Sequence, residues 1–388
     1  MSADRTLELD CSENWNHLLG AWRLRDSERG RRNLQSLAAT LGPENVRLLI
    51  APLTRFLPRT ADPDMALNNL ERFMSHAQAS SLLPEMLNQR GKLLEVLLSL
   101  FSTSQLFSDL LALQPNSLEM LRLPFRRGQR YTDLVDQLQE EVEWAADDSS
   151  LLRTFSRFRR SHLLRIGTND VIRDRTLEEV TRDISRVAEA ALSVAYRTAM
   201  THVSLKYGQP FTGDGRPITS VVFAFGKLGG EELNYSSDID LMFLYSEEGQ
   251  TRGGISIPAD EYFGRVVSEL LRLLGSHTDE GQAYRIDLRL RPEGHRGPLS
   301  RSLHSTLAYY DTLGRTWERQ ALIKVRPVAG DFELGDRFLR EIEPFVYRKY
   351  LSFAEINDIK ALKRRIEQKA KQAGADQREV KTGRGGIR

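Results

Sequence analysis

Residues 236–245 read SSDIDLMFLY, a stretch typical of a short β-strand, and this stretch decides the fold. In a strand alternate side chains share a face, so Asp238 and Asp240 point the same way, roughly 6.5–7 Å apart. The opposite face carries apolar side chains suited to packing against a core: Ile239, Leu241, Phe243 and Tyr245. Alone, an Asp-x-Asp pair in a strand is either a solvated face or turn entry, or a functional site, and its context must decide.

A third carboxylate lies in YRIDLRLRP, residues 284–292, which also reads as a strand. One face of that strand would carry Asp287 among arginines, and the other face would be apolar. The arginines are Arg285, Arg289 and Arg291. Such a face is commonly a solvated set of paired charges, but guanidinium groups also match phosphate oxygens bidentately. The segment therefore indicates either a charged surface or an anion site.

Three carboxylates on two neighbouring strands meet the needs of divalent cations. Mg²⁺ requires oxygen ligands and usually takes the remaining ones from substrate phosphates and water. Asp238 and Asp240 would hold a pair of cations, and Asp287 would complete the set. Phosphoryl and nucleotidyl transfer by two metals about 3.5–4 Å apart uses this layout.

A glycine-rich turn precedes the aspartates. Residues 221–225 read VVFAF, a buried strand, and run into GKLGGEELNY at 226–235, which predicts a glycine turn and one or two helical turns. Glycines let the backbone approach a ligand, and free N–H groups at a helix start favour phosphate. The turn is neither a Walker loop nor a Gly-x-Gly-x-x-Gly fingerprint, so alone it is weak evidence.

A further mixed segment, WERQALIKVR, occupies residues 317–326. If it is a strand, Lys324 and Arg326 lie on one face. Glu318 is either catalytic or an ion-pair partner, and we favour the ion pair. Carboxylates, a glycine turn and a cluster of cationic side chains, all between residues 226 and 326, together indicate phosphate chemistry more strongly than any one of them.

These residues resemble the polymerase-β nucleotidyltransferase superfamily, in which a glycine followed by Gly or Ser precedes Asp-x-Asp and a third Asp follows on a later strand. Lys227 stands where Gly or Ser is usual, so Ser236 or Ser237 would supply a hydroxyl contact to phosphate. Longer tracts resemble the family of bifunctional glutamine synthetase adenylyltransferase/adenylyl-removing enzymes, in the family's order. They cover residues 226–240, 284–292, 317–322, 344–350 and 383–388, and residues 95–205 resemble the family more loosely.

The resemblance implies a reaction. Enzymes of that family carry two copies of the catalytic module. The N-terminal copy removes AMP from a tyrosine of glutamine synthetase with phosphate, releasing ADP, and the C-terminal copy adds AMP from ATP. ELNYSSDID at 232–240 is similar to the N-terminal copy, because the C-terminal copy tends toward ELGYGSDLD. We therefore expect phosphorolysis of the adenylyl-tyrosine bond, a deadenylylation that regulates nitrogen assimilation.

Site roles follow from the same resemblance. Asp238, Asp240 and Asp287 would be the catalytic and metal-binding residues, holding two Mg²⁺ ions, with Mn²⁺ as an alternative. The expected phosphate- and nucleotide-binding residues are Gly226, Lys227, Gly229, Gly230, Ser236, Ser237, Arg289 and Arg291. The implied partners are glutamine synthetase, the PII signal protein, nucleotide and inorganic phosphate.

Two other functions stay open. One is adenylyl transfer from ATP to a protein tyrosine, which needs the same metals and carboxylates. The other is a non-catalytic module that binds glutamine synthetase or PII, for which three aspartates have no evident use.

Composition narrows the class of protein. Lys and Arg number 55 against 53 Asp and Glu, a formal charge of +2 that is too balanced to suggest nucleic-acid binding. The single cysteine, Cys11, excludes an intramolecular disulfide and fits a reducing cytoplasm. Residues 1–30 are charged throughout, unlike a signal peptide, and the longest apolar stretch, 93–101, is too short to cross a bilayer. We expect a cytoplasmic protein without a membrane span.

The resemblance implies an α+β fold with a polymerase-β-like nucleotidyltransferase core and a small mixed sheet, flanked by mainly helical N- and C-terminal regions. We expect an N-terminal helical region over 1–130 and a nucleotidyltransferase domain over 131–330. Within the latter, helices would lead at 131–205 and the mixed-sheet core would span 219–330. Residues 331–388 would begin a C-terminal helical domain that the family continues further, so we expect a truncated form of that architecture.

Local signals place several helices. Asp62 and Pro63 read as an N-cap and first helical residue. Thr176 and Glu179 form a capping-box pattern ahead of an apolar stripe. Residues 260–274 carry apolar side chains at helical spacing and predict a helix with one buried side.

Overall fold

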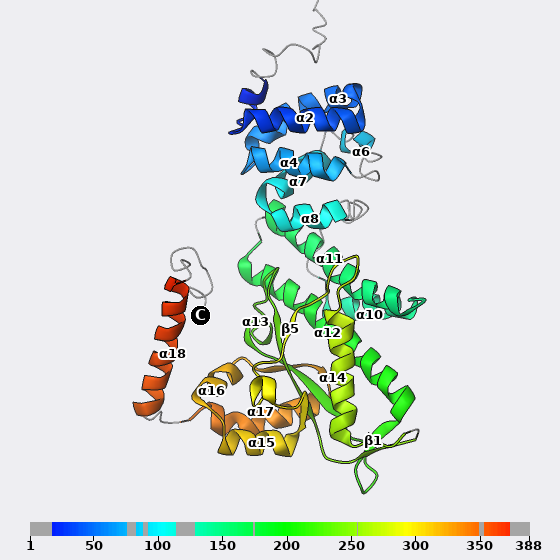
Figure 1. Cartoon of the computed structure of the whole chain (residues 1–388), viewed down its shortest axis with the longest axis vertical. Helices are drawn as coiled ribbons and strands as arrows, with labels where there is room; N and C mark the ends of the chain where they lie inside the picture. The colour runs from blue at the N-terminus through cyan, green and yellow to red at the C-terminus, as the bar shows by residue number, and fades with distance from the viewer. Residues whose placement is uncertain are drawn as a thin grey trace, which may run out of the picture. The chain divides into compact units, whose positions relative to one another are not determined.

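The computed structural model describes residues 18–75, 83–87, 92–113, 129–173, 175–253, 255–348 and 353–372. The chain folds as two compact units (Figure 1). Unit 1 comprises residues 1–187 and 277–283, and unit 2 comprises residues 188–276 and 284–388. The domain boundaries expected at 130/131 and 330/331 stay predictions.

Unit 1 is mainly helical in its described part. Its elements are α2 (Ser27–Leu41), α3 (Pro43–Phe56), the 3₁₀ turn η1 (Leu57–Arg59), α4 (Pro63–Met74), α6 (Leu83–Leu87), α7 (Lys92–Thr103), α8 (Gln105–Leu113), α10 (Tyr131–Glu143) and α11 (Asp148–Arg173). Helix α4 packs between α2 and α7 (Figure 1). Phe73 of α4 lies against Phe101 of α7, with ring centroids 5.7 Å apart. Burial of these apolar faces supplies the main stabilisation of such a helical unit.

The predicted helix starts are confirmed. Asp62 accepts a hydrogen bond from the Met65 N–H at 2.9 Å, which caps α4 with Pro63 at its first position. The long helix α12 (Leu177–Tyr207) begins where Thr176 accepts from the Glu179 N–H at 3.3 Å. The residues of α12 from 188 onward belong to unit 2.

In the described part of unit 2, five strands form a mixed sheet in the order β5-β3-β2-β7, with β6 also paired to β3. The strands are β2 (Ser220–Ala224), β3 (Ile239–Tyr245), β5 (Ile286–Asp287), β6 (Ser300–Ser302) and β7 (Arg326–Gly330). Strands β2 and β7 run antiparallel to their neighbours, whereas β5 and β6 pair in parallel with the start and the end of β3. A separate antiparallel pair joins β1 (Gln209–Phe211) to β4 (Gln250–Arg252).

Helices cover both faces of this sheet. The remaining elements are α13 (Gly226–Gly229), α14 (Ala259–Gly275), η4 (Gly294–Arg296), α15 (Leu303–Thr312), α16 (Thr316–Leu322), α17 (Phe332–Val346) and α18 (Phe353–Gln372). Tyr245 of β3 stacks on Phe263 of α14 at 5.1 Å, and Phe223 of β2 meets Phe338 of α17 at 5.0 Å. Beyond Asp240, strand β3 is therefore buried on both faces, and Met242, on the same face as Asp240, is buried too.

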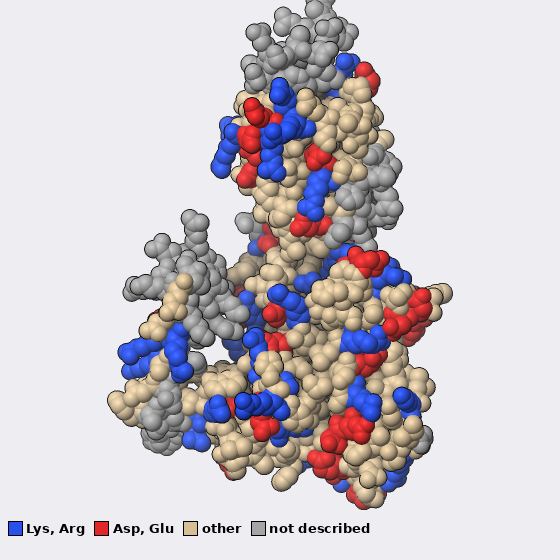
Figure 2. Space-filling view, in the orientation of Figure 1, with Lys and Arg blue, Asp and Glu red and all other residues tan. Residues whose placement is uncertain are grey.

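The expected α+β fold with a small mixed sheet and helical flanks is confirmed. The helix predicted at 260–274 is α14, and the glycine turn after β2 opens α13. In the described part of the chain, no helix is both long and apolar enough to span a membrane. Acidic and basic residues are interspersed on the face shown in Figure 2, in keeping with the balanced composition.

One strand prediction is too long, and one conditional strand is mostly helix. The strand expected over 284–292 is limited to β5, because Asp287 Oδ1 accepts from the Arg289 N–H at 2.8 Å and turns the chain away from the sheet. For residues 317–326, where a strand is only one alternative, residues 317–322 lie in helix α16 and strand β7 begins at Arg326. Cys11, residues 349–350 and residues 383–388 lie outside the described residues.

Candidate active site

The backbone brings the three predicted aspartates to one edge of the sheet. Asp240 is the second residue of β3, and its register partner in parallel strand β5 is Asp287. Asp238 lies two residues earlier, just ahead of β3, where the Ile239 N–H donates to the Arg285 carbonyl at 3.0 Å. Because register partners in a sheet present their side chains to the same face, Asp240 and Asp287 share a face of this edge.

Arginines pair with the two outer carboxylates. Arg285 Nε lies 2.6 Å from Asp238 Oδ1. Arg289 forms an ion pair with Asp287, in addition to the backbone hydrogen bond already described. The hydrogen bond from Arg289 is the main cause that lowers the pKa of the Asp287 carboxyl below its usual value. The same pair raises the pKa of Arg289, with Asp240 and Asp238 adding to the effect.

Gly226 lies directly behind Asp240. Its φ is +55°, a conformation that favours glycine, and a Cβ there would lie 2.8 Å from Asp240 Oδ2. The preceding Phe225 N–H donates to the Asp240 carbonyl at 2.9 Å, which ties the turn to β3. Glycine at 226 is thus favoured by its positive φ, and a larger residue there would also make the Asp240 carboxylate shift.

The rest of the glycine turn is fixed by packing. A Cβ on Gly229 would lie 2.0 Å from the Lys324 carbonyl oxygen, and one on Gly230 would lie 3.2 Å from Lys324 Cδ. Arg326 donates to the Gly229 carbonyl at 3.3 Å and pairs with Glu189 of α12. The backbone contact explains the glycine at 229 by the fold, whereas Gly230 faces only flexible side chains. The role of both glycines in binding phosphate stays a prediction.

Ser236 and Ser237 directly precede Asp238 in the sequence, and Lys227 of the glycine turn contacts Ser237. Lys227 Nζ is 3.3 Å from Ser237 Oγ, and the Ser237 hydroxyl in turn hydrogen-bonds to Asn234. Ser236 is exposed. A cationic amine and a hydroxyl side by side suit an anionic oxygen, and their role as phosphate ligands stays a prediction.

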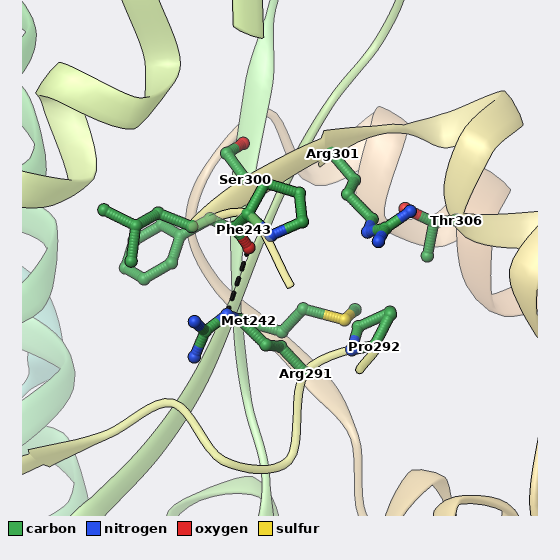
Figure 3. A pocket seen from close by; sticks show the side chains of 9 residues that line it. Met242, Phe243, Arg291, Pro292, Ser300, Arg301 and Thr306 are labelled. Carbon is green, nitrogen blue, oxygen red and sulfur yellow. Dashed lines mark hydrogen bonds between the residues drawn. The ribbon is translucent and has the colours of Figure 1, made fainter. Parts of the chain in front are cut away.

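Arg291 occupies a different place from the other arginines. It is buried, and its guanidinium donates to the carbonyls of Leu288, Gly297 and Pro298 at 2.8, 3.0 and 3.0 Å. Figure 3 shows this side chain beside Met242 at the wall of a small pocket, with the hydrogen bond to Pro298 as a dashed line. Burial lowers the pKa of Arg291. Its hydrogen bonds hold the loop after β5 together and give no support to a direct contact with phosphate.

Glu318 has a structural role. It is buried in α16 and accepts from the Tyr309 hydroxyl and from the Arg315 N–H, both at 2.8 Å. The interpretation favoured from the sequence is an ion-pair partner, but the partners that the structure gives are a hydroxyl and a backbone amide rather than a cation. A glutamate in the first turn of a helix, bonded back to the residue before the helix, is the pattern typical of this capping role.

Sequence reasoning placed Arg285 and Arg326 in a cationic cluster but did not identify the partners that the structure gives them. Arg285 is paired with Asp238 because the β3–β5 register places the two residues opposite each other. Arg326 reaches the glycine turn because β7 and β2 are neighbours. Neither relation is visible without the strand order.

The donor set fits hard divalent cations in its chemistry and in its register, since aspartate oxygens are the ligands that Mg²⁺ prefers. Within the described ranges, however, no three His, Cys, Asp or Glu side chains are gathered closely enough to hold a metal ion. Ligation by Asp238 and Asp287 would require each carboxylate to leave its arginine.

Comparison with known proteins gives a consistent result. The family model described as glutamate-ammonia ligase adenylyltransferase matches residues 94–341. Relatives from Hahella chejuensis and Pseudomonas aeruginosa are 39% and 40% identical over 72% and 66% of this chain, and one from Pseudomonas putida is 35% identical over 87%. Each is named bifunctional glutamine synthetase adenylyltransferase/adenylyl-removing enzyme.

The matched segments cover 30%, 26% and 35% of those three relatives, so the chain spans about a third of their length. The family model nevertheless covers more than half of the chain, including the glycine turn and all three aspartates. This chain belongs to the glutamate-ammonia ligase adenylyltransferase family.

Proposed function

We propose that this chain removes AMP from an adenylylated tyrosine of glutamine synthetase, using inorganic phosphate and releasing ADP. The observation that carries the proposal is the register of Asp240 with Asp287, next to Asp238 and to the arginines of the same edge. The names of the relatives support the substrate. The direction is supported by ELNYSSDID at 232–240, which is similar to the N-terminal catalytic copy of the family.

In the proposed reaction an oxygen of inorganic phosphate bonds to the AMP phosphorus as the bond from that phosphorus to the tyrosine oxygen breaks. The products are ADP and a phenolate, which takes a proton from water to restore tyrosine. Asp238, Asp240 and Asp287 would hold Mg²⁺, or alternatively Mn²⁺. When bound, such cations stabilise negative charge on the entering and leaving oxygens. The proposal gives Lys227 and Arg289 the task of orienting phosphate.

The protein partners are part of the proposal. Glutamine synthetase would supply the modified tyrosine, and control by the PII protein is proposed from the family resemblance alone. The runner-up reaction, AMP transfer from ATP to tyrosine, needs the same carboxylates and differs in its co-substrate.

The test is phosphate-dependent release of ADP from adenylylated glutamine synthetase in the presence of Mg²⁺. We expect release by the wild-type chain and a loss of at least about a hundredfold in Asp240→Asn, more than substitutions outside the ligand shell cost. Asp311→Asn is the matched control, because it removes an exposed carboxylate of α15 away from the site. The control should retain wild-type turnover.

Two results would contradict the proposal. ATP-dependent labelling of the tyrosine without phosphate-dependent release would assign the opposite direction. A folded chain that binds glutamine synthetase but carries out neither reaction would indicate a binding module.

A further inference from the structure

Arg285 is an exposed cation fixed opposite a proposed metal ligand. The register of β3 with β5 pairs Ile239 with Ile286, which places Arg285 across from Asp238. Its Nε lies 2.6 Å from Asp238 Oδ1, and the side chains are 69% and 44% exposed. Alternate residues of a strand share a face, so Arg285 lies on the same side of the chain as Asp287.

We propose that Arg285 is an exchange residue, which pairs with Asp238 when the site holds no cation and transfers to substrate phosphate when a divalent cation takes that carboxylate. The inference rests on the proposed function and adds a residue and a sequence of binding events to it. It makes Arg285 a determinant of how cation and phosphate binding depend on each other.

The energetics favour exchange at this position. An exposed ion pair is weak, because water and salt screen both charges, so a doubly charged cation displaces the guanidinium from Asp238 at little cost. The released guanidinium remains tethered to β5 beside the site, where its planar fork matches phosphate oxygens. Arg289 is held more firmly, because its Nε and Nη2 both donate to Asp287, whose side chain is only 14% exposed. Arg285 is therefore the arginine that exchanges first.

The proposal predicts effects of opposite sign for one substitution. Arg285→Gln removes the competitor for Asp238, so Mn²⁺ should bind about two- to fivefold more tightly, the range that an exposed ion pair supplies. The same change removes a charge-assisted donor to phosphate, so the KM for phosphate should rise at least about tenfold. Arg285→Lys keeps the charge but loses the fork, and should raise this KM while leaving Mn²⁺ affinity near wild type.

The experiment titrates the chain with Mn²⁺, following free Mn²⁺ by electron paramagnetic resonance, for wild type, Arg285→Gln, Arg285→Lys and Asp240→Asn. The matched control is Arg337→Gln on α17, since Arg337 pairs with Glu341 at 2.7 Å and the two side chains are 56% and 40% exposed. The control should bind Mn²⁺ as wild type does. The KM for phosphate is measured in the ADP-release assay.

The outcomes separate the two proposals. Tighter Mn²⁺ binding by Arg285→Gln with unchanged binding by Arg337→Gln supports the exchange, even if no turnover is detected. Wild-type binding that is lost in Asp240→Asn, together with unchanged or weaker binding in Arg285→Gln, overturns the exchange alone. A wild-type chain that binds Mn²⁺ no better than Asp240→Asn overturns the metal site of the proposed function and the exchange with it.

Discussion

His162 shows how burial, at the scale of one residue, sets the charge of a side chain. The imidazole lies inside unit 1 on α11, edge-on to the ring of Phe158 with centroids 4.4 Å apart. Neither ring nitrogen hydrogen-bonds to another residue that the structure describes. Burial, aided by the nearby charge of Arg165, lowers the pKa of His162 to about 3. The native state therefore holds this histidine neutral.

This environment predicts a loss of stability in acid. Below about pH 6.5 the unfolded chain binds a proton at His162 and the native state does not, so the free energy of unfolding falls until the pH nears the native pKa of about 3. From pH 7.5 to pH 5 the wild type should lose roughly 2 kcal/mol more than His162→Phe does, at 1.36 kcal/mol per pKa unit. Urea titrations at the two pH values measure the difference. His304→Gln, at an exposed position, should follow the wild type, and a His162→Phe variant that does so too would refute the assignment.

At the scale of an element, helix α17 covers one face of the sheet. Phe338 is fully buried against Phe223 of β2 and Tyr310 of α15, with ring centroids 5.0 and 6.5 Å away. Gly335 lets the helix approach closely, because a Cβ there would lie 2.8 Å from Pro327 of β7. The helix thus belongs to the core that supports β2 and β3.

Truncating the buried ring of α17 should therefore destabilise unit 2. We expect Phe338→Ala to lower the free energy of unfolding by about 3–5 kcal/mol, the cost of a large cavity in a core. Phe332→Ala on the same helix should cost well under 1 kcal/mol, since Phe332 is half exposed. Chemical denaturation of the two variants tests this contrast, and similar losses would show that α17 is not part of the core.

The elements also show what the sequence predicts and what it leaves open. Strand β3, the glycine turn and α14 were predictable because hydrophobic periodicity and glycine positions are local signals. The end of β5 was not, because the hydrogen bond from the Arg289 N–H to Asp287 competes with the strand ladder, and the sequence pattern does not rank the two.

The same reasoning applies to the site. The positions of the three aspartates on one edge followed from the alternation of side chains and from the family resemblance. The destinations of the arginines did not: Arg291 turns to carbonyls contributed by residues 297 and 298, and Arg285 to a carboxylate on another strand. Such partners depend on loop paths and strand order, which single-sequence periodicity does not contain.

At the scale of the whole molecule, the chain passes between its two units more than once. Residues 277–283 leave unit 2 after α14, fold with unit 1, and return to unit 2 at Tyr284, shortly before β5. These residues form a short hairpin, in which Thr278 and Gly281 pair, and the hairpin is anchored to α11. Arg160 donates to the Glu280 carbonyl at 2.9 Å and to the Glu280 carboxylate at 2.7 Å, and Ser156 donates to the Gly281 carbonyl at 3.1 Å.

The two arginines that pair with Glu280 differ in burial, which predicts different effects. Arg160 is 5% exposed and Arg157 is 53% exposed. Arg160→Ala leaves the carboxylate and carbonyl of Glu280 without their buried donor, so we expect a loss of about 2–3 kcal/mol of stability. Arg157→Ala removes an exposed ion pair and should cost less than about 1 kcal/mol. Urea denaturation of the two variants measures both losses.

The hairpin also predicts a functional consequence, because β5 with Asp287 begins three residues after Ala283. We expect that loosening residues 277–283 lets the residues just before β5 move, which would disturb the register of Asp287 with Asp240. At a temperature where both variants stay folded, Arg160→Ala should lower ADP release at saturating phosphate, whereas Arg157→Ala should not. Equal stability losses in the two variants, or full turnover by Arg160→Ala, would contradict a role of the hairpin in positioning β5. The position of β5 would then depend on its pairing with β3 alone.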